Sequence, residues 1–483
     1  MFPAEQDKLL ESLMAQFPER RTFFRAFFSQ AEKEKQGGSL AYYLLKLFAL
    51  RPARWLDRVV IGMLAAAPSM AHVEIAKRSV SEMLGAMVKV QPDGNDDLEA
   101  AQAALCALFR SENLAPSRVS CAALMGQTSS AWGGMYHPRG GFRAVAEELV
   151  DSIHASGGRV LTRARTTSVI VEDGRAEGVT VVREGKTGPA TAVDVLIGGD
   201  GLGSVISSVG VIDTFRRLLP RPPALTGGAA AGDGAAGGVS GSGSTRETVS
   251  ALGEKDGEGL DPAGFGILRA ARPQVHLCVG LQGNWLEDLD GTSSYVHHVR
   301  DSMVDGSKQD WYRISFCESK DSTGWYKETS TAVVTAEMSD AEMAKVTIDG
   351  FRQGTTNEPI GPLRYTVQSS RSARERMRER LLQRLHQDFP QTQGRDEFVM
   401  LAEQPRAGLS EGPERYLAKG VRAPTKVRGL FLAGEDLTIS GMEGSVMGGW
   451  IAAHAALGYT PTDMFLRRRS LASDIPNLDK LRG

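Results

Sequence analysis

The chain has 483 residues, a length that accommodates two or three domains of ordinary size. Hydrophobic residues make up 41% and charged residues 24%, and 56 Lys and Arg against 58 Asp and Glu leave a net charge of −2. This balance provides no overall field that would favour nucleic acid or an anionic membrane as a partner. The four cysteines, at positions 106, 121, 278 and 317, form no CxxC pair, so we expect buried free thiols and no metal site.

The first 130 residues favour helices, because apolar residues recur at three- and four-residue spacing in stretches such as QDKLLESLMAQF. The charged N-terminus lacks the apolar core of a secretory signal. The longest apolar run, Leu40–Leu50, is interrupted by Lys46 and is too short to span a bilayer. It fits either a core helix or a helix on a membrane surface, since Arg51 and Arg54 follow its aromatic and aliphatic residues.

From Tyr136 the pattern changes to a helix, a Gly157–Gly158 stop, a strand and a β-hairpin that turns at Asp173–Gly174. The stretch Ala192–Gly201 is typical of a buried strand that ends in a glycine turn. Residues 221–245 are rich in Gly, Ala and Ser and lack the apolar mass to pack, so they predict a disordered loop.

Residues 264–339 are typical of strands and turns, and RERMRERLLQRLHQDF predicts a charged amphipathic helix. Near the C-terminus, Val427–Tyr459 predicts a buried strand, a glycine turn and a helix whose first turn is rich in small residues. The N-terminus of such a helix favours a phosphate or an electron-rich ring carbonyl. An ordinary strand–loop–helix crossover explains the same spacing, and both interpretations remain open at this point.

Val427–Tyr459 resembles the C-terminal flavin motif of the FAD-dependent carotenoid and retinoid oxidoreductases, which include phytoene desaturases, carotenoid isomerases and retinol saturases. Tyr136–Val179 is similar to the same family through its Pro-Arg-Gly-Gly, helix, Gly-Gly, strand and hairpin. Stretches such as VHLCVGLQGNWLEDLDG and IPNLDKL are most similar to the retinol saturases (all-trans-retinol 13,14-reductases). The resemblance implies an α/β fold: a Rossmann-like FAD/NAD(P)-binding domain built from discontinuous segments, with an inserted α+β substrate domain.

The resemblance also implies which residues would hold FAD. The strand end would meet the pyrophosphate and the ribityl chain, the small residues after it would line the flavin-side turn, the Arg-Gly-Gly would approach the cofactor, and a strand threonine would meet the adenine through its backbone. In the same order, these residues are Gly434, Glu435 and Asp436 at the strand end; Gly441, Glu443, Gly444 and Ser445 in the segment after it; Arg139, Gly140 and Gly141 in the Arg-Gly-Gly; and Thr166 on the strand.

One expected part of such a site is not found. Dinucleotide-binding folds begin with a strand, GxGxxG and a helix, yet no GxGxxG precedes Tyr136. The literal match Gly232–Gly237 lies in the low-complexity segment, without a strand before it, and we reject it. We therefore expect the N-terminal βαβ unit to be missing, whether lost, carried on another chain or absent in nature. A second departure is Glu411-Gly412, which stands where the family has an aromatic-glycine pair.

The resemblance implies reduction of a conjugated polyene by hydride exchange with FAD, with NAD(P)H as a candidate electron donor, and peripheral contact with an endoplasmic reticulum or plastid membrane. Alternatives are a carotenoid isomerase or desaturase on the same scaffold, and a non-catalytic remnant that binds an apolar ligand or a partner. No acid–base residue is assigned, and His297–His298 is interpreted as a strand-surface feature. The expected segments are helical substrate domain 1–130, FAD-binding 131–220, loop 221–250, substrate domain 251–420, FAD-binding 421–465 and tail 466–483.

Overall fold

A computed structural model describes most of the regular elements of the chain. The described residues are 6–33, 74–88, 117–125, 141–183, 191–197, 203–219, 268–283, 294–298, 311–316, 329–338, 367–404, 408–417 and 421–458, with residues 101, 105, 138, 342 and 343. The predicted loop 221–245, the apolar run Leu40–Leu50, and Arg139 and Gly140 lie outside these residues.

The chain divides into two compact units. Unit 1 comprises Met1–Ser39, Glu74–Thr162 and Ala270–Pro413. Unit 2 comprises Leu40–Val73, Arg163–Arg269 and Glu414–Gly483. Each unit is therefore assembled from three segments that are distant in the sequence.

The N-terminal part of unit 1 is helical, as the apolar spacing predicts. Its core is formed by phenylalanines at i, i+1, i+4 and i+5 of the second helix, at positions 23, 24, 27 and 28, which pack against Leu13 and Leu124. The elements are α1 (Gln6–Gln16), η1 (Pro18–Arg20), α2 (Arg21–Lys33) and α6 (Val80–Val88).

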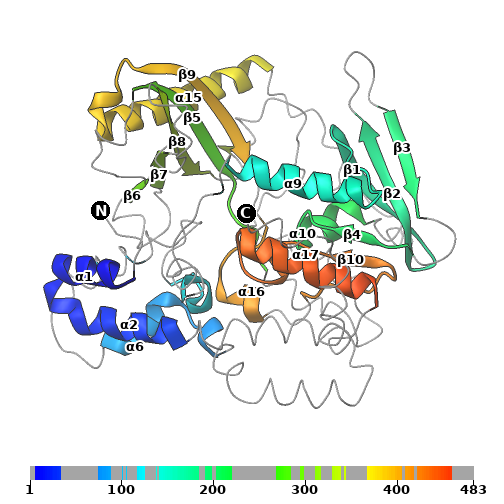
Figure 1. Cartoon of the computed structure of the whole chain (residues 1–483), viewed down its shortest axis with the longest axis horizontal. Coiled ribbons are helices and arrows are strands. Elements are labelled where there is room, and N and C mark those ends of the chain that lie inside the picture. Colours follow the sequence, from blue (N-terminus) through cyan, green and yellow to red (C-terminus); the bar gives the residue numbers. More distant parts are fainter. Residues whose placement is uncertain are drawn as a thin grey trace, which may run out of the picture. The chain divides into compact units, whose positions relative to one another are not determined.

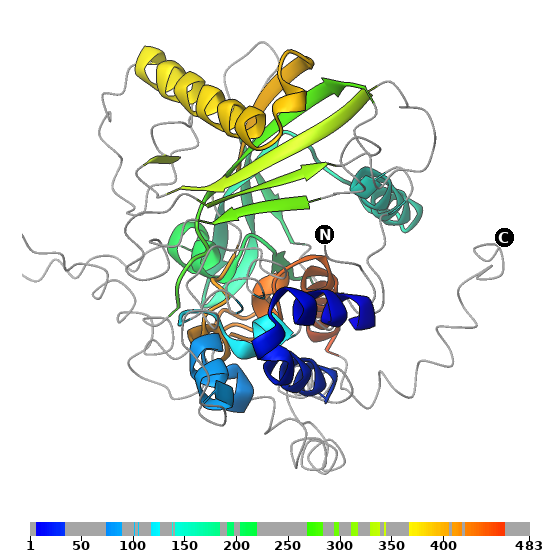
Figure 2. The ribbon, with the colours of Figure 1, turned by 90° about the vertical axis from the view of Figure 1, so that its left-hand side faces the viewer.

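A five-stranded antiparallel sheet forms the second part of unit 1, in the order β6-β7-β8-β5-β9. Alternate residues of β5 (Gln274–Gln282), from Val275 to Leu281, are buried against Leu381 and Leu385 of helix α15. Figure 2 shows α15 lying along one face of this sheet. The elements are β5 (Gln274–Gln282), β6 (Ser294–His298), β7 (Trp311–Phe316), β8 (Thr329–Glu337), α15 (Val367–Asp388), η6 (Pro390–Thr392) and β9 (Asp396–Gln404).

Helix α9 (Gly141–Ala155) is the helix predicted after the Arg-Gly-Gly, and it ends at the predicted glycines. Gly157 has a φ of 79°, and the Gly158 amide donates to the Ile153 carbonyl at 2.8 Å, which closes the last turn. No residue of α9 is buried, although it carries Phe142 and Leu149.

Unit 2 contains an antiparallel sheet of β1 (Ala164–Glu172), β2 (Arg175–Arg183) and β3 (Thr191–Leu196). The hairpin turn is Asp173–Gly174, as predicted, and both residues have positive φ, which matches the twist of the paired strands. The prediction that the third strand is buried is wrong. All six residues of β3 are exposed, because β3 is an edge strand that pairs only with β2 among the described strands.

The second sheet of unit 2 is a parallel pair, β4 (Val205–Ser207) and β10 (Leu430–Leu432), joined over three residues each. The other edge of β10 is occupied by residues 423–425: the Leu432 amide donates to the Ala423 carbonyl at 2.7 Å. The described part of the chain is therefore mixed α/β, with a two-stranded parallel sheet. Short helices follow both strands: α10 (Val211–Asp213), η3 (Thr214–Leu218), η7 (Glu435–Leu437) and α17 (Met442–Ala456), with α16 (Pro413–Leu417) nearby in sequence (Figure 1).

Candidate functional site

The candidate site is the turn between β10 and α17, residues Gly434–Gly441, which we call the glycine turn. Leu430 and Leu432 are buried, and they anchor the strand that delivers Gly434 to the sheet edge. Gly434 has a φ of 95°, a conformation that strongly favours glycine. The chain then closes a 3-10 turn, in which the Thr438 amide donates to the Glu435 carbonyl at 3.0 Å. The predicted strand, glycine turn and helix are thus confirmed.

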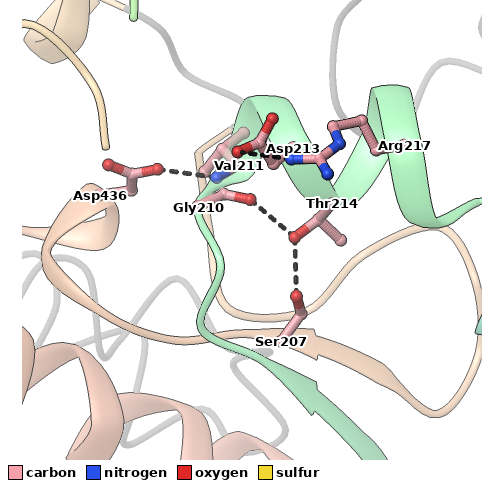
Figure 3. Close-up of polar contacts among 7 residues, drawn as sticks. All are labelled: Ser207, Gly210, Val211, Asp213, Thr214, Arg217 and Asp436. Carbon is pink, nitrogen blue, oxygen red and sulfur yellow. Dashed lines mark hydrogen bonds and ion pairs between the residues drawn. The ribbon is translucent and has the colours of Figure 1, made fainter. Parts of the chain in front are cut away.

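Asp436 lies inside the protein, with 3% of its surface exposed. Its Oδ2 accepts a hydrogen bond from the amide of Val211 at 2.7 Å (Figure 3). Val211 is the first residue of α10, the helix that follows β4. Because β4 and β10 are parallel, their carboxyl ends meet at one edge, and the carboxylate at the end of one strand caps the helix that follows the other.

The junction after β4 is fixed by side chains from β4 and from the helical turns that follow it (Figure 3). Thr214 donates from its hydroxyl to the Gly210 carbonyl at 2.6 Å, so its oxygen accepts from the Ser207 hydroxyl at 2.7 Å. Asp213 and Arg217 form an ion pair at 3.6 Å one turn apart. The amide that Asp436 caps is therefore held in a defined position.

Two glycines of α17 are required by packing. A Cβ added at Gly444 would overlap with the carbonyl of Ile439, and one added at Gly448 would overlap with the carbonyl of Gly434. Thr438 strengthens the first of these approaches by donating to the Gly444 carbonyl at 2.9 Å. The side of Gly444 that a Cβ would occupy is therefore taken up by the protein's own turn.

Gly441 is different, since nothing lies within 4 Å of the place where its Cβ would be. Its φ is 104°, it is exposed, and its amide donates to Oε2 of Glu435 at 2.6 Å. Glu443 and Ser445 of the same helical turn are also exposed. The open side of the site is thus the N-terminal turn of α17.

Arg415 of α16 was missed by the sequence analysis. It is 2% exposed and donates to the Ser440 hydroxyl at 2.7 Å and to the carbonyl of Glu435. It contacts both ends of the glycine turn. The only sequence signal was its position in the segment Gln404–Val421, where the chain departs from the family pattern.

The remaining predicted residues lie elsewhere in the fold. Thr166 is half-buried on β1, next to an irregularity of the hairpin register, in the antiparallel sheet of unit 2. Gly141 opens α9 in unit 1 with a φ of 73°, and its amide donates to the Pro138 carbonyl at 2.9 Å. The structure therefore brings Gly434, Glu435, Asp436 and the first turn of α17 together, while Thr166 lies on another sheet and Gly141 in the other unit.

Two properties of the described residues bear on other kinds of site. No cluster of three or more His, Cys, Asp and Glu side chains in that part of the chain could hold a metal ion. Of the two cysteines whose side chains are described, Cys121 is buried and Cys278 is partly exposed, and neither forms a disulfide.

Among the helices described, none combines the length and the hydropathy that crossing a bilayer requires.

Comparison with known proteins gives distant likenesses only. No protein-family model matches the sequence, and no curated protein matches it. The structure is similar to that of an oxidoreductase from Methanosarcina mazei, with a TM-score of 0.41 and 16% identity, over 84% of this chain and 74% of that one. It is also similar to a Rab GDI from Plasmodium falciparum, with a TM-score of 0.34 and 11% identity, over 86% of this chain and 65% of that one. Both scores are low, so neither likeness assigns a function to this chain.

Proposed function

We propose that this protein is a flavin-dependent oxidoreductase that acts on a conjugated polyene, with saturation of the retinol-saturase type as its reaction. The observation that carries the proposal is the glycine turn: a buried strand ends at a left-handed glycine, and the open Gly441 begins an exposed helix. Ligands of α/β folds collect at such strand ends. When bound, the flavin supplies the hydride chemistry, and the protein supplies orientation.

The residues of the turn fit the ribityl and ring side of a flavin better than its phosphates. Backbone amides at the N-terminus of α17 favour an electron-rich ring carbonyl. Glu435 and Glu443 place carboxylates beside it, which suits ligand hydroxyls and opposes phosphate. Gly434, Gly441 and Ser445 would form the contact surface, whereas Asp436 and Gly444 act inside the protein. FAD is thus proposed to bind through its flavin half.

An apolar substrate is supported by the face of the five-stranded sheet opposite α15. There Cys278 pairs across the strands with Val333 and Met400, and the ring of Phe398 lies over Gly280. Phe398 and Met400 are 52% and 56% exposed, so two large apolar side chains lie open to solvent on this face. This surface is proposed as the contact for the polyene.

The same sheet face has a polar end. His276 is hydrogen-bonded through Nδ1 to Thr335 and through Nε2 to Gln404, both at 2.9 Å. His276 and Gly280 are four residues apart on one strand, a distance of about 13 Å. A rod-like apolar molecule with a terminal oxygen suits this surface better than a hydrocarbon carotenoid, so a retinol-like polyene is the preferred substrate, with isomerisation or desaturation of a carotenoid as the alternative reaction.

A second candidate function is non-catalytic binding of another polypeptide. It is favoured by the apolar stripe Met442, Val446, Trp450 on α17, whose side chains are between 41% and 63% exposed. Parallel sheets usually have both faces covered, and a pair of three-residue strands is small for one. On this reading the exposed stripe is an interface, and the glycine turn is a crossover without a ligand.

A flavin titration distinguishes the two functions. We expect the purified protein to carry no stoichiometric flavin, because the sequence offers no phosphate loop at a strand–helix junction. Added riboflavin, FMN and FAD should nonetheless bind with similar, weak affinities, measured by the quenching of flavin fluorescence. Adenosine diphosphate should not compete with them for the protein. No binding of any flavin would contradict the oxidoreductase proposal and favour the interface. Stoichiometric FAD in the purified protein, displaced by adenosine diphosphate, would contradict binding through the flavin half.

A further inference from the structure

Arg415 is a buried cation that donates to acceptors near both ends of the glycine turn. It is 2% exposed, and a buried charge is tolerated only where hydrogen bonds replace its lost hydration. Its Nη1 donates to the hydroxyl of Ser440 at 2.7 Å, and its Nη2 donates to the carbonyl of Glu435. These partners are the second and the seventh residues of the glycine turn, so the guanidinium bridges nearly the whole turn.

The geometry requires arginine. A guanidinium carries donors in a rigid planar fork, and each arm here reaches a different acceptor. The ammonium of lysine would keep the charge but could not occupy both positions with the same geometry. The identity of this residue is thus specified by the turn that it holds.

A second set of contacts holds the turn independently of Arg415. Asp436 accepts from the Val211 amide on α10, and Glu435 accepts from the Gly441 amide. Arg415 adds α16 to this arrangement, so α10 and α16 both hold the backbone between Gly434 and Gly441, which is also closed by its own Glu435–Gly441 contact. The conformational entropy of the turn is then lost during folding, so little more is lost when a ligand binds.

We infer that Arg415 is a positioning residue, which holds the glycine turn in the shape that leaves Gly441 open to the ligand. It contacts no ligand itself, because its side chain is buried beneath the turn. For the identity of the ligand this inference rests on the proposed function. The contacts of Arg415 with Ser440 and Glu435, which we call the clamp, follow from the geometry alone.

The test compares Arg415→Lys and Ser440→Ala with a matched control. The control is Arg428→Lys, because Arg428 also donates to a backbone carbonyl, that of Asp173 at 2.8 Å, but is exposed and lies at the hairpin turn. Ser440→Ala removes one of the two acceptors and leaves the guanidinium itself in place. Three quantities are measured on the full chain: affinity for FMN by flavin fluorescence, the thermal midpoint, and hydrogen exchange of the amides between Leu437 and Gly441.

We expect FMN affinity to fall roughly tenfold in Arg415→Lys and about two- to tenfold in Ser440→Ala, and to stay unchanged in the control. Faster exchange should be confined to the glycine turn, including the Gly441 amide. The inference is overturned if Ser440→Ala and Arg415→Lys bind FMN as the unaltered protein does, or if exchange rises uniformly, as a purely global loss of stability would cause.

The same measurements distinguish an error in the proposed function from an error in this inference. If the unaltered protein binds no flavin, the ligand role of Arg415 falls with the proposed function. Exchange confined to the turn in Ser440→Ala would still establish the clamp, and unchanged exchange would overturn it.

Discussion

At the scale of single residues, the role of Asp436 follows from the direction in which its carboxylate points. The residue comes directly after a buried strand, where an acidic side chain is expected to meet the hydroxyls of a ligand. Its carboxylate instead faces α10 and accepts the Val211 amide at 2.7 Å. The sequence could place Asp436 at the strand end but could not identify this partner, which is 225 residues away.

Replacing Asp436 tests this capping role. Asp436→Ala leaves the Val211 amide without its acceptor and should lower the free energy of unfolding by about 1–2 kcal/mol, the usual value of a helix cap. Asp436→Asn keeps an acceptor oxygen and should lose less. Melting curves are recorded with and without FMN, and the loss should be equal in both. A loss seen only in the presence of FMN would assign Asp436 to the ligand.

Two glycines of α17 differ in whether packing leaves room for a side chain. Gly444→Ala should lower the free energy of unfolding by about 1–3 kcal/mol, because its Cβ would overlap with the Ile439 carbonyl. Gly449 is the matched control in the same helix, with nothing within 4 Å of its Cβ position. Gly449→Ala should be neutral or raise stability by up to about 1 kcal/mol. Chemical denaturation measures both, and equal effects would contradict the close approach of the turn to α17.

At the scale of elements, local patterns predicted most of what the structure shows. The hairpin at Asp173–Gly174, the helix that ends at Gly157–Gly158, α15 and the strand–turn–helix near the C-terminus follow from short-range spacing and turn chemistry. The exposure of β3 does not, because a strand with alternating Val193 and Val195 looks the same whether it is central or at an edge. The buried position of Arg415 likewise depends on packing between distant segments.

The sheet face proposed for the polyene can be probed through Cys278. Burial raises the pKa of its thiol above the ordinary value of 9.0. Less thiolate is therefore present at a given pH, and alkylation of Cys278 by N-ethylmaleimide should be slower than that of a small thiol. Its rate should continue to rise with pH above the ordinary pKa of a thiol. Peptide mass spectrometry isolates this cysteine from the others, and the buried Cys121 should stay unlabelled in the folded protein.

The same reaction reports ligand contact. Because Cys278 lies between Val333 and Met400, a bound polyene should slow its alkylation. Retinol should protect more than a hydrocarbon polyene, since the hydrogen-bonded group around His276 offers a partner for a terminal oxygen. Equal rates with and without retinol would remove this sheet face from the proposed site, and equal protection by both ligands would remove the preference for retinol.

At the scale of the whole molecule, the proposed substrate raises the question of how the protein reaches a lipid-borne polyene. No described helix is long and apolar enough to span a bilayer. The segment Leu40–Trp55 lies outside the described residues, but its sequence places aromatic and aliphatic residues beside Lys46, Arg51 and Arg54. Such a composition favours a helix on the surface of an anionic membrane, where apolar burial and basic side chains act together, although it also fits a core helix.

Charge reversal separates these two interpretations. Lys46→Glu combined with Arg54→Glu should weaken co-sedimentation with anionic liposomes by roughly thirtyfold or more, because each basic residue near such a surface contributes about 1 kcal/mol. Raised salt should have the same effect on the unaltered protein, since the attraction is screened. Lys426→Glu with Arg428→Glu is a control of equal charge change at exposed positions of unit 2 and should leave binding nearly intact. If the segment is a core helix, the first pair should lower the thermal midpoint and the unaltered protein should not bind liposomes. That result would end the membrane proposal and require the polyene to be delivered from solution or by a carrier.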